Sequence, residues 1–78
     1  MTTFENVKKL AVKFLAIADK LNVNVSRYLN GSNDIKDIRA YDLVRAADKK
    51  FIDALNDFYG CKDYEYGLNY ELAETYLY

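Results

Sequence analysis

Apolar side chains recur at helical spacing through the first 21 residues of the chain. The positions are Phe4, Val7, Leu10, Ala11, Phe14, Leu15, Ile17, Ala18 and Leu21. On a helix with 3.6 residues per turn they form a stripe roughly 160° wide, which is broad enough to be covered by more than one neighbouring element. The pattern predicts a long central helix that begins near Thr3, with a capping box formed by Thr2 and Glu5 at its start.

Two further helices are predicted in the middle of the chain. Residues 22–24 interrupt the first stripe, and Asn24 can cap a short helix through Leu29, which ends at the Asn30-Gly31 pair because glycine accepts the left-handed conformation. Residues 32–34 supply the next loop and cap. A long helix follows and is stopped by Gly60. Its predicted inner face is Ala40, Leu43, Val44, Ala47, Phe51, Ala54, Leu55 and Phe58.

The C-terminal part combines a connection with a last predicted helix. Residues 61–67 lack an apolar helical stripe and are compatible with a loop or a short strand. Apolar residues then recur every four positions from Leu68 through Leu72 to Tyr76, which predicts a helix over 68–78 that docks on the first helix. Together with the length of 78 residues, these patterns predict one all-α domain over residues 1–78, a small bundle of three longer helices plus one short helix.

Residue types needed for catalysis and cofactor binding are scarce. The chain has no histidine to act as a base near neutral pH, and its lone cysteine, Cys61, follows a helix C-terminus that disfavours a thiolate. No phosphate-binding glycine motif occurs among the three glycines. Asn30, Ser32 and Asp34 alternate like the first oxygen ligands of a calcium-binding loop, but Ile35 stands where that loop needs glycine and Tyr41 where it needs glutamate. We therefore expect no enzyme activity, no catalytic residue, no metal site and no cofactor.

The composition also predicts the cellular compartment. A single cysteine cannot form an intramolecular disulfide, which favours a reducing compartment, and we expect a cytoplasmic protein. Lysines interrupt the apolar residues near the N-terminus, so neither a signal peptide nor a membrane span of about 20 apolar residues is predicted.

Charge and tyrosine are distributed unevenly along the chain. The 11 basic and 12 acidic residues give a net charge of −1, but residues 1–30 carry +3, residues 31–52 carry +1 and residues 53–78 carry −5. Six of the eight tyrosines lie in the last 20 residues, among these carboxylates. Tyrosine is enriched at binding hot spots, and neighbouring carboxylates select arginine-rich and lysine-rich surfaces. Completion of a small core would account for about half of these tyrosines.

The C-terminal third therefore contains the first candidate site, a surface for a basic protein partner. Its residues are Tyr64, Glu65, Tyr66, Tyr70, Glu71, Glu74 and Tyr78. With Leu68, Leu72 and Tyr76 facing inward, a helix over 68–78 would place Tyr70, Glu74 and Tyr78 on the opposite side. That partner surface could be one that otherwise binds nucleic acid, and a homodimer is also compatible with the sequence.

A second candidate site lies in the middle of the chain. The segment Val25-Ser26-Arg27-Tyr28-Leu29-Asn30-Gly31, with residues 17–21 before it and 43–47 after it, resembles the helix-turn-helix headpiece of lactose-repressor-type regulators. This resemblance implies a DNA-binding regulator in which Ser26, Arg27 and Tyr28 face bases or phosphates. Only residues 22–24 separate Leu21 from Val25, about one helical turn less than the family's spacing.

The leading hypothesis is a non-enzymatic binding protein that docks its acidic, tyrosine-rich end on a basic partner and so blocks or adapts that partner. In size, composition and charge the chain is similar to small phage-encoded inhibitors of host machinery, including anti-CRISPR proteins. The alternative is the DNA-binding regulator with a degenerate helix-turn-helix at residues 17–47.

Overall fold

The computed structural model describes residues 2–77, and its first helix follows the predicted apolar stripe. α1 spans Phe4–Lys20 and buries Val7, Ala11, Phe14 and Ala18. Its N-cap is Thr3, whose hydroxyl accepts a hydrogen bond from the Asn6 amide at 3.2 Å. The predicted cap at Thr2 was therefore one residue too early, because the backbone amide of Thr2 donates to the Asp57 carboxylate at 2.6 Å instead.

α2 (Asn22–Leu29) follows α1 after the single residue Leu21. It begins earlier than predicted, and Asn24 does not cap it, because the Asn24 side chain donates to the carboxylate of Asp37 at 2.9 Å. The predicted end is confirmed. Gly31 adopts a φ of 96°, and the amide of Ser32 reaches back to the Arg27 carbonyl at 2.9 Å, which closes the helix with a Schellman motif.

α3 (Ile35–Tyr59) has the predicted cap and the predicted stop, since Asp34 accepts from the Lys36 amide and Gly60 ends the helix with a φ of 62°. The buried face of α3 differs from the predicted inner face at its edges. Leu43 was predicted to face inward but is 59% exposed, whereas Ile52 is fully buried. The buried face is rotated toward the side of α3 that carries Asp48, because residues 67–69 attach there.

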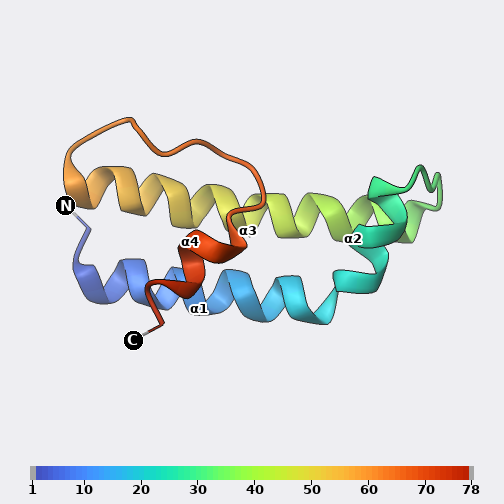
Figure 1. Ribbon diagram of the computed structural model, residues 1–78, viewed down its shortest axis with the longest axis horizontal. Helices are drawn as coiled ribbons and strands as arrows, with labels where there is room; N and C mark the ends of the chain where they lie inside the picture. Colours follow the sequence, from blue (N-terminus) through green and yellow to red (C-terminus); the bar gives the residue numbers. More distant parts are fainter. Residues whose placement is uncertain (1, 78) are drawn as a thin grey trace.

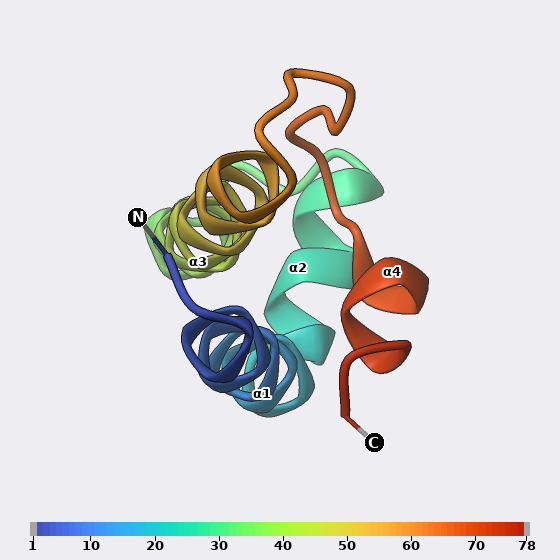
Figure 2. The same cartoon turned by 90° about the vertical axis from the view of Figure 1, so that its left-hand side faces the viewer.

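The helices form a bundle in which α1 and α3 run side by side in opposite directions (Figure 1). α2 packs on α3 at one end of this pair, and α4 (Tyr70–Glu74) packs on α1 from the side, as the end view shows (Figure 2). The core lies between them. Its buried apolar side chains are Val7, Ala11, Phe14, Ala18, Val25, Val44, Phe51, Ile52, Ala54, Leu55 and Ala73.

α4 docks on α1 as predicted but is much shorter than the predicted helix over 68–78. It cannot begin at residue 68, because the backbone of Asn69 is held in a non-helical conformation with a ψ of 53°. After Glu74 the chain tightens into turns, in which the amides of Tyr76 and Leu77 bond to carbonyls three residues back. Residues 61–67 form no strand, and the loop interpretation of this segment is the right one.

The prediction of an all-α bundle with three longer helices and one short helix is thus confirmed for the described residues. The short helix is α4, whereas we expected the second helix to be the short one. Within residues 2–77, no helix combines the length and apolarity needed to cross a membrane.

Candidate functional site

A fully buried carboxylate, Asp48 on α3, fixes the C-terminal segment. It accepts hydrogen bonds from the backbone amide of Gly67 at 2.8 Å and from the backbone amide and side-chain amide of Asn69 at 3.1 and 2.8 Å. Three donors fill most of the acceptor sites of a carboxylate, which number about four, and so offset its removal from water. Asp48 thereby sets the point at which the chain enters α4.

Asn56, also on α3, fixes the middle of the same segment. Its side-chain amide donates to the Tyr64 carbonyl at 3.0 Å and accepts from the Tyr64 amide at 3.1 Å, as a neighbouring strand would. Two residues along, the hydroxyl of Tyr66 donates to Asp53. These contacts place Tyr64, Glu65 and Tyr66 over the C-terminal half of α3, around a hollow of about 470 Å³.

Tyr66 was predicted to contact a partner, but its polar end is already engaged within the chain. The hydrogen bond to Asp53 raises the pKa of the Tyr66 hydroxyl, and the same bond, together with the ion pair from Lys49 at 2.9 Å, lowers the pKa of Asp53. The Lys49 ammonium also lies 5.2 Å from the centre of the Tyr66 ring. About half of the Tyr66 surface stays exposed, and the adjacent Glu65 is exposed as well.

Tyr70 does not point outward, and this part of the prediction is wrong. Its ring stacks on Phe14 with 5.5 Å between ring centres, and burial raises the pKa of its hydroxyl. The physical reason is that α4 begins at Tyr70, directly after the anchored Asn69, so that Tyr70 and the fully buried Ala73 share the face that packs on α1. Tyr78 lies outside the described residues.

The predicted partner surface is divided between two places. Tyr64, Glu65 and Tyr66 lie over α3, whereas Tyr70 and Glu74 lie beside α1 and α2. Glu71 and Glu74 are both exposed on α4. The carboxylates of the C-terminal third are therefore accessible as predicted, but they do not form one acidic tyrosine face.

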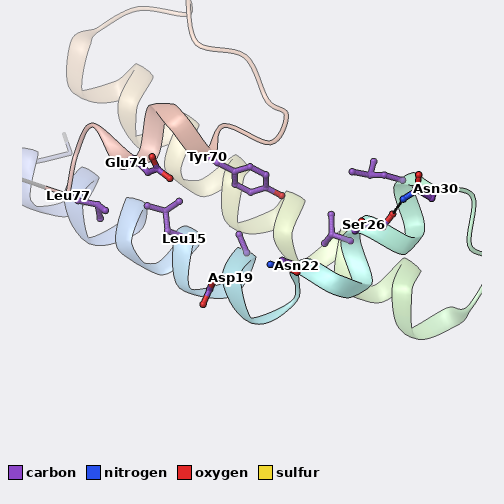
Figure 3. A pocket seen from close by; sticks show the side chains of 11 residues that line it. Leu15, Asp19, Asn22, Ser26, Asn30, Tyr70, Glu74 and Leu77 are labelled. Atoms are coloured by element: carbon purple, nitrogen blue, oxygen red, sulfur yellow. Dashed lines mark hydrogen bonds between the residues drawn. The ribbon is translucent and has the colours of Figure 1, made fainter.

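Tyr70 and Glu74 form part of a groove of about 840 Å³ between α1, α2 and α4, which we call the α1/α2/α4 groove (Figure 3). The lining residues are Leu15, Ala18, Asp19, Asn22, Val25, Ser26, Leu29, Asn30, Tyr70, Glu74 and Leu77. In Figure 3 the Tyr70 ring lies between an end formed by Leu15 and Leu77 and an end formed by Ser26 and Asn30. Most of these residues were not predicted as site residues. The one sequence signal was the polar series at positions 22, 26 and 30, which share one face of α2.

The three residues of the alternative DNA-binding site point in different directions, since consecutive helix residues are about 100° apart. Ser26 faces the groove and Arg27 is exposed. Tyr28 is half-buried and stacks on Tyr41 with 4.3 Å between ring centres. The connection between α1 and α2 is the single residue Leu21, shorter than the turn of three to four residues that joins the helices of a helix-turn-helix.

A second buried carboxylate, Asp37, joins α2 to the start of α3. It accepts from the Ser32 hydroxyl at 2.7 Å and from the Asn24 side chain at 2.9 Å, and these bonds lower its pKa below the ordinary value of 3.8. In acid, the unfolded chain therefore binds a proton before the folded chain does. The contribution of Asp37 to the stability of the folded chain is complete well above the ordinary Asp pKa of 3.8, and it is lost as the pH falls through the lower pKa of the folded chain.

This arrangement predicts acid sensitivity of folding. The free energy of unfolding, measured with urea, should begin to fall below about pH 5 and should continue to fall as the pH drops below the ordinary pKa of 3.8. Asp37→Asn removes the titrating group, so the variant should be less stable at neutral pH but should lose less stability over this range. The same pH dependence in both proteins would contradict the assignment to Asp37.

Within residues 2–77, cysteine and acidic side chains do not gather in groups of three or more that could hold a metal ion. Comparison with known proteins gave no match to a protein-family model, to a curated protein or to a solved structure.

Proposed function

We propose that this chain is a small, non-enzymatic protein-binding module that docks an acidic surface on a basic protein partner. One observation carries the proposal. Asp63, Glu65, Glu71 and Glu74 are all exposed, and the one ion pair within residues 2–77 joins Lys49 to Asp53. The charge of these four carboxylates is therefore not neutralised within the described chain, and it is free to attract lysine and arginine side chains.

Exposed tyrosine rings support the same function. Tyr59 and Tyr66 each expose about half of their surface, and both belong to residues 53–78, which we call the acidic segment. An arginine side chain can stack on such a ring while it pairs with a nearby carboxylate, so the combination favours arginine-bearing partners.

The biological form that we propose is an inhibitor or adaptor that covers the basic surface of its partner. The support for it is the similarity in size, composition and charge to small phage-encoded inhibitors, including anti-CRISPR proteins. A reducing compartment such as the cytoplasm suits the free thiol of Cys61.

Two double charge reversals test the proposal. Glu71→Lys with Glu74→Lys should weaken binding of a peptide of alternating arginine and glycine by about fivefold or more at low salt and should reduce the salt dependence. Glu5→Lys with Asp42→Lys changes the net charge by the same amount at exposed positions outside the acidic segment, and it should have a much smaller effect. Calorimetric titration of the folded variants gives the affinities, and melting temperatures control for folding.

Equal losses in the two double variants would show that net charge alone attracts the peptide, and the proposal would fail. A gel shift with duplex DNA at two salt concentrations tests the alternative. Sequence-specific binding that is abolished by Arg27→Ala would favour the DNA-binding regulator instead.

A further inference from the structure

The α1/α2/α4 groove is open to solvent and is lined by both apolar and polar side chains. Seven of its 11 lining residues are exposed, among them Leu29 with 59% and Leu77 with 38% of their surface. Three further apolar residues line the groove with less exposure: Leu15 is half-buried, and Ala18 and Val25 are buried members of the core. Small ligands are usually held in sites that bury 70–90% of their surface, so an open groove of this kind fits a larger occupant.

The walls of the groove determine which backbone conformation can bind there. Nine of the 11 lining residues lie in α1, α2 or α4, and Asn30 and Leu77 lie just beyond the ends of α2 and α4. Helical walls bond their own amides and carbonyls, so they offer no edge to which an extended peptide could add as a strand. A helix brings its backbone hydrogen bonds with it and needs only side-chain packing.

The charge of the groove selects the side chains of the occupant. Asp19 and Glu74 line it, and no lysine or arginine is among the lining residues described. Neither carboxylate has an ion-pair partner within residues 2–77. A second copy of this chain docked groove to groove would set these carboxylates against the same carboxylates, which opposes that arrangement.

From these observations we infer that the α1/α2/α4 groove receives an amphipathic helix of the partner, with leucine-like residues on its inner face and lysine or arginine at its flanks. This inference rests on the proposed function, because it names the part of the basic partner that this chain recognises. The occupant's apolar residues would contact Leu29, Leu77 and Tyr70, and its cations would pair with Asp19 and Glu74.

The test uses tryptophan as a reporter, because the chain contains none. Leu29→Trp places one in the groove, and Val23→Trp places one at an exposed position of α2 that does not line it. The probe is a helical peptide of leucine, lysine and alanine with an apolar stripe, compared with a scrambled peptide of the same composition. The striped peptide should shift the emission of Leu29→Trp to shorter wavelength and leave Val23→Trp unchanged, and the scrambled peptide should shift neither.

A second measurement does not depend on tryptophan. Glu71 and Glu74 are both exposed on α4, but only Glu74 lines the groove, so the two form a matched pair. In calorimetric titrations, Glu74→Lys should weaken binding of the striped peptide by about fivefold or more, and Glu71→Lys should weaken it by less than about twofold. Asp19→Lys should resemble Glu74→Lys.

The outcomes separate this inference from the proposed function. Equal binding of the two peptides, an unchanged Leu29→Trp spectrum, or equal effects at Glu71 and Glu74 would overturn the groove assignment, even where the arginine–glycine peptide still prefers the acidic segment. Concentration-dependent dimerisation with a blue-shifted Leu29→Trp spectrum in the absence of peptide would assign the groove to a second copy and also overturn it. If the striped peptide shifts the Leu29→Trp emission but the double charge reversals have equal effects on the arginine–glycine peptide, the groove assignment stands. Only the proposal that the wider acidic surface binds the partner then fails.

Discussion

Replacing Phe14 by alanine should lower the free energy of unfolding by about 3–5 kcal/mol. Phe14 is fully buried, and its ring stacks between Phe51 of α3 and Tyr70 of α4, with ring centres 6.3 and 5.5 Å away. The substitution would leave a cavity where α1, α3 and α4 meet, and it would remove the aromatic contact that seats α4. Urea unfolding monitored by circular dichroism measures the loss.

Val12→Ala is the matched control, because Val12 lies on the same helix and is exposed. Its effect should stay within about 0.5 kcal/mol. A loss at Phe14 as small as that of the control would mean that the three-helix contact does not exist in solution.

Asp48→Ala should cost about 2–4 kcal/mol, because it removes the acceptor of three hydrogen bonds in a fully buried site. Asp48→Asn keeps one acceptor oxygen and should fall between the wild type and the alanine variant. The backbone amide proton resonances of Gly67 and Asn69 should move upfield in the alanine variant, because both amides lose their hydrogen-bond acceptor. Urea unfolding and two-dimensional NMR provide the two measurements.

Asp42→Ala removes an exposed carboxylate from the same helix and should change stability by about 0.5 kcal/mol or less. If Asp48→Ala were as mild as Asp42→Ala, residues 67–69 would have to be held by something other than this carboxylate.

The helices that pack along their whole length were predictable from the sequence. Phe14 and Phe51 fall on apolar stripes, and Gly31 and Gly60 end α2 and α3 where glycine was expected to do so. The first cap was harder to place, because Thr2 and Thr3 both offer a hydroxyl. The structure places the cap at Thr3, whereas the backbone amide of Thr2 donates to Asp57, which is 55 residues away.

The two buried aspartates were not predicted, although their positions gave a signal. Asp37 and Asp48 continue the stripe of Ala40, Val44 and Phe51, so each carboxylate occupies a core position of α3. Aspartates in an amphipathic helix are normally assigned to its solvent-exposed face. The donors that permit their burial come from other segments, up to 21 residues away for Asp48, and periodicity carries no information about them.

The predicted outward face of a helix over 68–78 was wrong for a related reason. The spacing of Leu68, Leu72 and Tyr76 assumes one continuous helix, but the anchored Asn69 delays its start and turns Tyr70 inward. The α1/α2/α4 groove could not be predicted either, since its walls come from three segments whose relative placement depends on that anchor.

The hydrogen bonds that Asp48 accepts from Gly67 and Asn69 also determine whether the α1/α2/α4 groove is formed. α4 has five residues, too few for a helix that is stable by itself, so the wall that carries Tyr70 and Glu74 persists only while the segment stays attached. Local opening of this segment requires less free energy than global unfolding, and it removes one wall of the groove while α1 and α2 remain folded. Any molecule that touches both walls binds only the closed form, so it slows amide hydrogen exchange of residues 67–77. Its apparent affinity is scaled by the fraction of molecules that are closed, which couples the strength of a surface contact to one carboxylate in the core.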